Sequence, residues 1–368
     1  MNRVHGSARG ALATAAAALL LLVACAEVPT TPSRPVEIPV FPPPPEQPRF
    51  FYERTLMSSA DVVLDDKDAS LRRLLTGEVK TGEGMSKPYG VAARNGRVYV
   101  GDTVDRSIVM FDLAANRYKR FGLEDPGSVR MPFGIDIDTQ GNVYVVDGTA
   151  KRVQVYDADG KFLRTLVADL KWKRPVGIAL DDKRRRMYIV DAGGVDSEDH
   201  FVRAVDLDSG RVLFDVGKRG EGPGEFNLPR DAVIGPGGEL YVVDGGNFRV
   251  QVFDSDGKFV KTFGAVGRQG GQFSRPKEIA VDKDGNVYVV DTAFGNFQIF
   301  DREGRLLLDV GGRSNTNAPA RFMLPSGIAV DVDGRVYMVD QFFRKVDVFR
   351  PALLPAGSPY GAARPAAK

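Results

Sequence analysis

The chain has 368 residues with 50 basic and 48 acidic side chains, which leaves a formal net charge of +2 at pH 7. A general nucleic-acid-binding surface carries a strong basic excess, so this balance argues against one. The single cysteine, Cys25, excludes structural disulfides within a monomer.

Residues 1–24 are predicted to be a signal peptide. Arg3 and Arg9 precede the apolar run Ala11–Ala24, and Leu22-Val-Ala-Cys25 ends it. The pattern resembles a bacterial lipoprotein signal with its lipobox, and the resemblance implies that cleavage leaves a lipidated Cys25 at the mature N-terminus. The alternative is an ordinary secretory signal followed by a chance cysteine.

A lipid anchor would place the protein in the bacterial cell envelope. Ala26 stands after Cys25, where an aspartate would resemble an inner-membrane retention signal. We therefore expect attachment to the outer membrane, facing the periplasm or the cell surface. No other segment has the roughly 20 apolar residues of a membrane-spanning helix, so the membrane is expected to be contacted through the anchor alone.

Residues 25–50 are predicted to form a tether. Nine prolines lie between Ala26 and Phe50, and this density prevents both helix and sheet pairing, so we expect a semi-rigid spacer rising about 3.1 Å per residue. Plain disorder is the alternative. Residues 51–70 are a lead-in that we expect outside the last repeat or beneath the fold, and residues 351–368, rich in Pro, Ala and Gly, are predicted to be a disordered tail.

Residues 71–350 contain six copies of one unit. In Arg275–Gly304, two β-branched runs flank a turn in which Gly285 can take a positive φ, and two further apolar runs follow. Four-stranded units with a period in the forties are typical of propeller blades. The sequence therefore predicts an all-β fold, a six-bladed β-propeller of four-stranded antiparallel blades. Each copy has a tyrosine strand that ends on an aspartate, at Tyr99–Asp102, Tyr144–Asp147, Tyr188–Asp191, Tyr241–Asp244, Tyr288–Asp291 and Tyr337–Asp340.

The sixth copy lacks its fourth strand, because Lys345–Phe349 runs directly into Pro351. An open last blade would expose a strand edge, so we expect an N-terminal strand to complete it. Leu71–Thr76 resembles the fourth strands of other copies and is predicted to pair with Val346–Phe349. The aspartate that closes each tyrosine strand is often followed four or five residues later by an Arg or Lys and is expected to fix its loop by pairing with it; Asn296 departs from this pattern in blade five.

The repeat resembles the NHL family. The pattern Pro-x-Gly-Ile-Ala-Val-Asp-x-Asp-Gly-x-Val-Tyr-Val-Val-Asp, followed by Arg-Val-Gln-Val-Phe-Asp as at Arg249–Asp254, carries the resemblance over about 280 of the 368 residues. It implies the propeller fold and leaves the function open. Similar proteins include RNA- and protein-binding modules, sensor domains of bacterial membrane kinases, and amidating lyases.

A resemblance to the amidating lyases implies a zinc site built from several histidines. This chain has only His5, which is lost with the signal, and His200. We therefore expect neither a metal nor another cofactor, and a binding module is the first prediction. The alternative is an extracytoplasmic lyase or hydrolase that uses channel carboxylates or a metal outside the family pattern.

The residues after each blade's proline are expected to converge on the mouth of the central channel at the top face, where ligands meet related propellers. Blades four and five carry charges there, whereas blades one and two carry aromatic rings. We predict that this rim binds a protein or polysaccharide partner of a monomeric propeller; the alternative is that its charges pair with one another and plug the channel. The predicted partner-binding residues are Tyr89, Phe133, Arg230, Asp231, Lys277 and Glu278.

A second, weaker candidate is the acidic loop Asp191–His200, which is five residues longer than its counterpart in blade two. It is interpreted as a solvated loop, with a cation site or a partner contact as the alternative. Asp136 stands where other inner strands carry alanine, and nothing in the sequence explains it.

Overall fold

The computed structural model describes residues 38–65, 67–168 and 170–362. The signal peptide, Cys25 and the first part of the tether lie outside the described residues. Within the described ranges, no helix is both long and apolar enough to cross a membrane.

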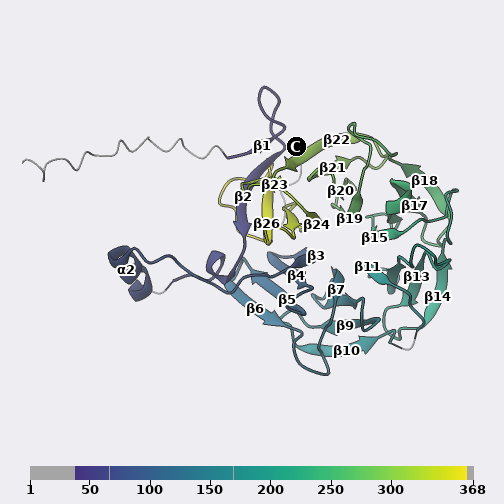
Figure 1. The fold of residues 1–368 in the computed structure, drawn as a ribbon, viewed down its shortest axis with the longest axis horizontal. Coiled ribbons are helices and arrows are strands. Elements are labelled where there is room, and N and C mark those ends of the chain that lie inside the picture. The colour runs from purple at the N-terminus through teal and green to yellow at the C-terminus, as the bar shows by residue number, and fades with distance from the viewer. Residues whose placement is uncertain (1–37, 66, 169, 363–368) are drawn as a thin grey trace, which may run out of the picture. The chain divides into compact units, whose positions relative to one another are not determined.

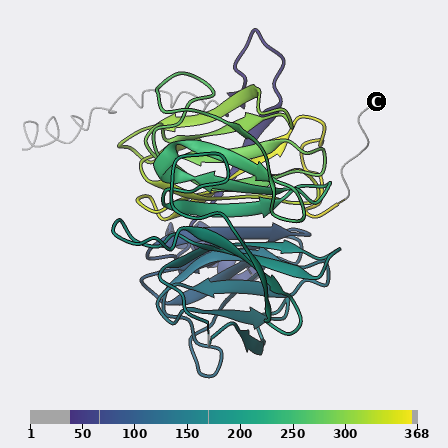
Figure 2. The same cartoon turned by 90° about the vertical axis from the view of Figure 1, so that its right-hand side faces the viewer.

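Six antiparallel sheets are arranged around a central axis as the blades of a propeller (Figure 1). Seen edge-on, the strands run across the thickness of the ring, so that their ends and loops lie on its two faces (Figure 2). The predicted six-bladed β-propeller is confirmed.

The strands of each blade follow one another from the axis outward. Blade one holds β3 (Pro88–Arg94), β4 (Arg97–Asp102), β5 (Ser107–Asp112) and β6 (Arg117–Phe121); blade two holds β7 (Pro132–Ile137), β8 (Val143–Asp147), β9 (Arg152–Tyr156) and β10 (Phe162–Leu166); blade three holds β11 (Pro175–Asp181), β12 (Arg186–Asp191), β13 (Phe201–Asp206) and β14 (Val212–Val216).

The remaining three blades repeat this order with two additions. Blade four holds β15 (Pro229–Ile234), β16 (Leu240–Asp244), the 3-10 turn η2 (Gly245–Asn247), β17 (Arg249–Phe253) and β18 (Phe259–Phe263); blade five holds β19 (Pro276–Val281), β20 (Val287–Asp291), β21 (Asn296–Phe300), β22 (Leu306–Arg313) and the short parallel β23 (Arg321–Phe322); blade six holds β24 (Pro325–Val330), β25 (Val336–Asp340) and β26 (Lys345–Pro351).

The core lies between the blades. The second and third strands are β-branched and aromatic, and both of their faces are buried against neighbouring sheets. Six clusters of buried side chains result, and each combines residues from two adjacent blades. The ring is therefore held by six similar apolar interfaces and has no single centre.

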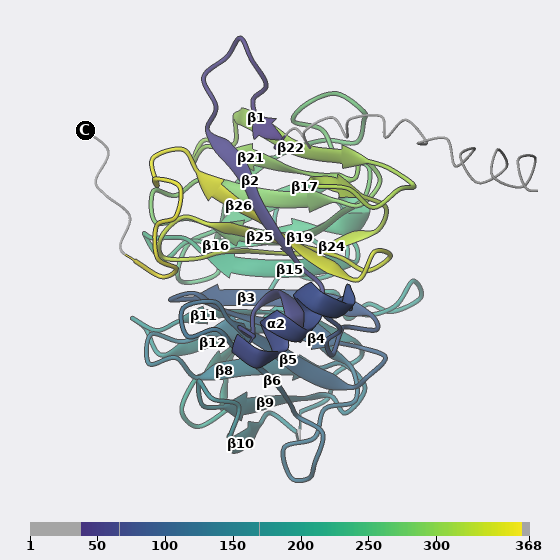
Figure 3. The same cartoon turned by 90° about the vertical axis from the view of Figure 1, so that its left-hand side faces the viewer.

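Blade six is completed by an N-terminal strand, as predicted, but by a different one. β2 (Phe50–Leu56) pairs antiparallel with β26, with Tyr52 opposite Phe349 and Leu56 opposite Val346. Figure 3 shows β2 lying beside β26. The prediction that Leu71–Thr76 forms this strand is wrong.

The physical reason lies in the two sequences. Leu56 is fully buried between blades six and one. Leu71–Thr76 instead belongs to helix α2 (Lys67–Thr76), a run without β-branched residues except its last, and Leu74 and Leu75 are 81% and 76% exposed. A strand that closes a propeller has to bury apolar side chains, and α2 leaves these two in solvent. The short 3-10 helix η1 (Ser59–Asp61) lies between the two elements.

The predicted domain limits shift at both ends of the propeller. β1 (Val40–Phe41) pairs with β2, so the last part of the predicted tether belongs to blade six. Residues 351–361, predicted to be part of a disordered tail, are instead ordered by contacts: Leu354 is buried, and the Tyr360 ring lies 4.1 Å from the guanidinium of Arg335. The Pro, Ala and Gly content of this segment did not predict these contacts, because they depend on residues of blade six such as Arg335.

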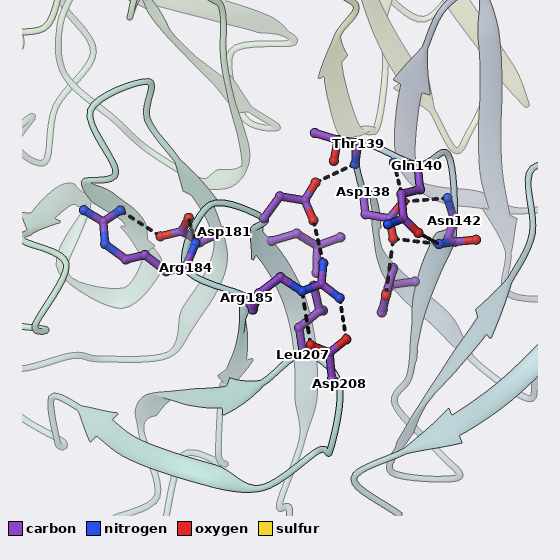
Figure 4. A network of polar contacts seen from close by, with 12 residues as sticks. Asp138, Thr139, Gln140, Asn142, Asp181, Arg184, Arg185, Leu207 and Asp208 are labelled. Atoms are coloured by element: carbon purple, nitrogen blue, oxygen red, sulfur yellow. Dashed lines mark hydrogen bonds and ion pairs between the residues drawn. The ribbon is translucent and has the colours of Figure 1, made fainter.

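The hairpin turns on the face opposite the mouth are linked by polar contacts (Figure 4). Asp138 accepts the main-chain N–H groups of Gln140 and Asn142, at 3.0 and 2.7 Å. In the next blade Arg185 donates to Asp208 at 3.1 Å from its Nε. These turns are thus structural parts of blades two and three.

Candidate functional site

The channel mouth is built from the same main-chain pattern in successive blades. In five blades the residue that follows the closing aspartate donates its N–H to the carbonyl of the residue before the inner-strand proline; the pairs are Thr103 with Lys87, Gly148 with Met131, Ala192 with Arg174, Thr292 with Arg275, and Gln341 with Leu324. In blade four the N–H of Gly246 is donated to the carbonyl of Asn227 instead. The side chains on either side of each proline are therefore held on a rigid frame.

The closing aspartates fix this frame, although not in the predicted way. All six are fully buried, and Asp191, for example, accepts the N–H groups of Lys173 and Arg174, each at 2.8 Å. Among the described residues only Asp244 forms the predicted ion pair, with Arg249 at 2.9 Å. Main-chain donors inside the blade satisfy the carboxylates first, which is why no cation is needed.

The structure brings the predicted aromatic and basic rim residues together. The ring centroids of Tyr89 and Phe133 are 4.8 Å apart, and the Lys277 ammonium lies 4.3 Å from the centre of the Tyr89 ring. Burial raises the pKa of the Tyr89 phenol, and the nearby charge of Arg230 opposes that rise. Four blades thus meet at one point of the mouth, and whether this point binds a partner stays a prediction.

The alternative interpretation, a plug of paired charges, does not hold at this rim. Neither Arg230 nor Lys277 makes an ion pair with any carboxylate of the described residues. Burial lowers the pKa of Lys277 to about 8, with Glu278 raising it and Arg230 lowering it further. The two cations are therefore partly desolvated and remain without an anionic partner.

Asp231 and Glu278 lie deeper than the prediction placed them. They are 9% and 8% exposed and line a cavity of about 450 Å³ that occupies the channel below the rim. Asp231 accepts the N–H of Ile279 in the next blade at 3.2 Å. These two carboxyls form the floor between the mouth and the cavity.

Asp136 belongs to the same inner wall. Its Oδ2 accepts the N–H of Leu180 from the next blade at 2.8 Å, and it faces the channel cavity. Burial raises the pKa of Asp136 and of Asp231 to about 7, and that of Glu278 well above its usual range. Inner strands have unpaired N–H groups toward the channel, and these carboxyls accept some of them.

The glycines next to the rim are needed for close approach. A Cβ atom on Gly177 would lie 2.6 Å from Oδ1 of Asp231, and one on Gly90 would lie 1.9 Å from the carbonyl oxygen of Phe133. Side chains at these positions would push the inner strands apart. The glycine in blade three thus makes room for the carboxyl of Asp231, and the glycine in blade one makes room for the main chain of blade two.

His200 has a structural place. It is fully buried, its Nε2 lies 2.9 Å from the carbonyl of Gly194, and its Nδ1 accepts the N–H of Leu228 at 3.3 Å. The acidic loop ahead of it contacts the connection between blades three and four through Glu198 and Arg219, 3.4 Å apart. Within the described part of the chain, no group of three His, Cys, Asp or Glu side chains is arranged to hold a metal ion.

The sequence interpretation missed other cations of the mouth. Arg174, Arg275 and Lys87 each precede an inner-strand proline, and their charges act on Arg230 or Lys277. The predicted rim contains only residues that follow the proline, although the residues before and after the proline lie at the same end of the inner strand. A comparison of both positions across the repeats would have found them.

Six four-stranded blades closed by a terminal strand define a six-bladed β-propeller. The NHL repeat family matches residues 226–253, which run from the entry of blade four to the end of β17. The chain thus folds as a six-bladed β-propeller and contains an NHL repeat in blade four. NHL repeat-containing protein 3 of Mus musculus is 37% identical over 106 residues, a match that spans 28% of this chain and 28% of that protein.

Solved propellers extend the likeness in fold. A gluconolactonase from Xanthomonas campestris has 15% sequence identity and a TM-score of 0.55, with 87% of this chain and 99% of that chain covered. A streptogramin B lyase has 14% identity and a TM-score of 0.53, with 73% and 94% covered. At this identity the likeness shows the fold alone.

Proposed function

We propose that the protein is a lipid-anchored binding module of the bacterial cell envelope, which holds a protein or polysaccharide partner at the mouth of the propeller. The observation that carries the proposal is the rim itself, where Arg230 and Lys277 lie partly buried beside two aromatic rings without an anionic partner. Desolvated cations and aromatic rings on a rigid frame are the features of a binding hot spot.

Partner capture tests the role of the mouth. The full-length protein is crosslinked in cells and purified, and the partners of the wild type are compared with those of an Arg230→Ala/Lys277→Ala variant. The control variant, Lys258→Ala/Lys283→Ala, removes two exposed lysines from hairpin turns on the opposite face. We expect a partner that is lost only in the mouth variant; capture of the same partner by all three proteins would contradict the proposal.

The anchor is a separate part of the proposal and rests on the pattern around Cys25. A Cys25→Ser variant is expected to lose the lipid and to leave the membrane fraction, while the folded propeller is unchanged. The readouts are the mass of the N-terminal peptide and fractionation of the envelope. A Cys25→Ser protein that stays in the membrane would rule out the anchor.

A second candidate is an extracytoplasmic hydrolase or lyase that works in the channel cavity. The observation that favours it is the group of Asp136, Asp231 and Glu278, whose pKa values are all raised by burial beside a cavity of about 450 Å³. Turnover of a panel of small lactones and esters, lost in Glu278→Gln, would support this candidate. Absence of turnover by the wild type leaves the binding module as the proposal.

A further inference from the structure

The mouth is more basic than its two predicted cations suggest. Lys87, Arg174 and Arg275 lie close enough to the central pair for their charges to lower the pKa of Arg230 or of Lys277. None of these five side chains makes an ion pair with a carboxylate of the described residues. Because like charges repel one another, a cluster of five cations without carboxylate partners destabilises the folded protein.

Two buried donors near the mouth also lack an acceptor. The Nε atom of Arg174 and the Nε2 atom of Gln341 are buried without a hydrogen-bond partner. Gln341, which is 8% exposed, stands in blade six where blade two has Gly148, and a Cβ on Gly148 would touch Phe133. A buried donor that is left unpaired destabilises the folded protein, so such atoms indicate a missing acceptor.

Among the described residues, Asp231 and Glu278 do not serve as this acceptor. Asp231 already accepts a main-chain N–H of β19, and a main-chain N–H of β24 interacts with Glu278. Both carboxyls also have raised pKa values, which favours their neutral forms. The acidic floor therefore does little to neutralise the cations above it.

We infer that the mouth is an oxyanion-binding site, in which Arg174, Arg230 and Lys277 hold a carboxylate, sulfate or phosphate group of the ligand. This inference rests on the proposed function and names the chemistry of the anchoring group. Guanidinium groups bind such anions through paired hydrogen bonds, and Arg174 and Arg230 supply two of them beside the point charge of Lys277. Gln341 adds a neutral donor at the blade-six side.

The test is a calorimetric titration of the full-length mature protein with sodium sulfate and, separately, with sodium citrate. We expect wild-type binding of at least one probe to weaken about tenfold or more in Arg230→Gln/Lys277→Gln. Lys258→Gln/Lys283→Gln, with the same change in net charge, is expected to bind as the wild type does. Sulfate alone would indicate an ester of sulfate or phosphate, and citrate alone a carboxylate ligand.

Thermal melting of each variant shows whether it is folded, and Arg174→Gln provides a second, single-site variant on another blade. No binding by the wild type, or equal binding by both double variants, overturns the inference. Partner capture that is lost in Arg230→Ala/Lys277→Ala, although the wild type binds neither sulfate nor citrate, would also overturn it and leave the proposed function standing. Sulfate binding at the mouth without any captured partner would support the oxyanion site and contradict the proposed partner-binding function.

Discussion

At the residue scale, Lys277 decides how binding depends on pH. Its pKa is lowered to about 8 by burial, with opposing effects of Glu278 on its own strand and Arg230 on blade four. Tyr89 and Lys87 of blade one and Asp340 of blade six also face it. A cation with this pKa loses its charge within the range in which arginines keep theirs.

Sulfate affinity is therefore expected to fall severalfold between pH 7 and pH 9, because sulfate keeps its charge over this range while Lys277 loses its proton. The measurement is the dissociation constant at a series of pH values. Lys277→Gln is expected to bind more weakly at pH 7 and to show a flat profile. A wild-type profile that is flat as well would contradict the role given to Lys277.

The channel carboxyls Asp136 and Asp231 make a second prediction at this scale. Their pKa values are raised to about 7 in the folded protein, above the ordinary value of 3.8. The folded state then binds more protons than the unfolded state between about pH 4 and pH 7, so stability is highest below this window and is lost as the pH rises through it.

The expected loss in the free energy of unfolding between pH 4 and pH 7 is on the order of a few kcal/mol. Urea unfolding across this range measures it. The Asp136→Asn/Asp231→Asn variant is expected to show a flatter dependence, because it lacks both titrating groups. A wild type that gains stability over this window would show that these carboxyls are ionised from low pH.

At the element scale, the closing strand β2 makes the ring continuous. Leu56→Ala is expected to lower the free energy of unfolding by about 2–5 kcal/mol, because it empties a fully buried site between blades six and one. Leu74→Ala, the same substitution in α2, is expected to change it by less than about 0.5 kcal/mol, since Leu74 is 81% exposed. Denaturant unfolding measures both losses. A larger loss in Leu74→Ala than in Leu56→Ala would favour Leu71–Thr76 as the closing strand.

The two chain ends are joined to blade six at Arg335. This side chain is fully buried, its Nε lies 2.6 Å from Glu53 of β2, and it donates to the carbonyl of Ser358 at 2.8 Å. It also pairs with the buried Asp333. One cation thus connects the N-terminal strand, the β24–β25 hairpin and the C-terminal segment.

Arg335→Ala is expected to cost about 3–5 kcal/mol, because it leaves Asp333 buried without its partner. Arg305→Ala is the control: its ion pair with Asp301 leaves the arginine side chain 75% exposed, and such pairs contribute about 0–1 kcal/mol. Thermal and denaturant unfolding give the comparison. Equal, small losses in both variants would show that the ends of the chain are held by other contacts.

At the scale of the whole molecule, the ring separates two environments along its axis. The mouth gathers cations from blades one, three, four and five, whereas the channel below holds carboxyls from blades two, four and five. No single blade contains either group. A near-neutral chain thus acquires a local basic site because the ring brings equivalent positions of different blades together.

The sequence alone determined the blade number, the strand order within a blade and the convergence of Tyr89, Phe133, Arg230 and Lys277, because a repeated pattern places equivalent residues at equivalent points. Only the tertiary structure decided which N-terminal segment closes the ring, since Phe50–Leu56 and Leu71–Thr76 differ in what they bury against blade six. It also decided the depth of Asp231 and Glu278 and the place of Asp136. The positions of these carboxyls depend on which main-chain N–H groups of a neighbouring blade lie within hydrogen-bond distance, and the closed ring sets the distance between blades.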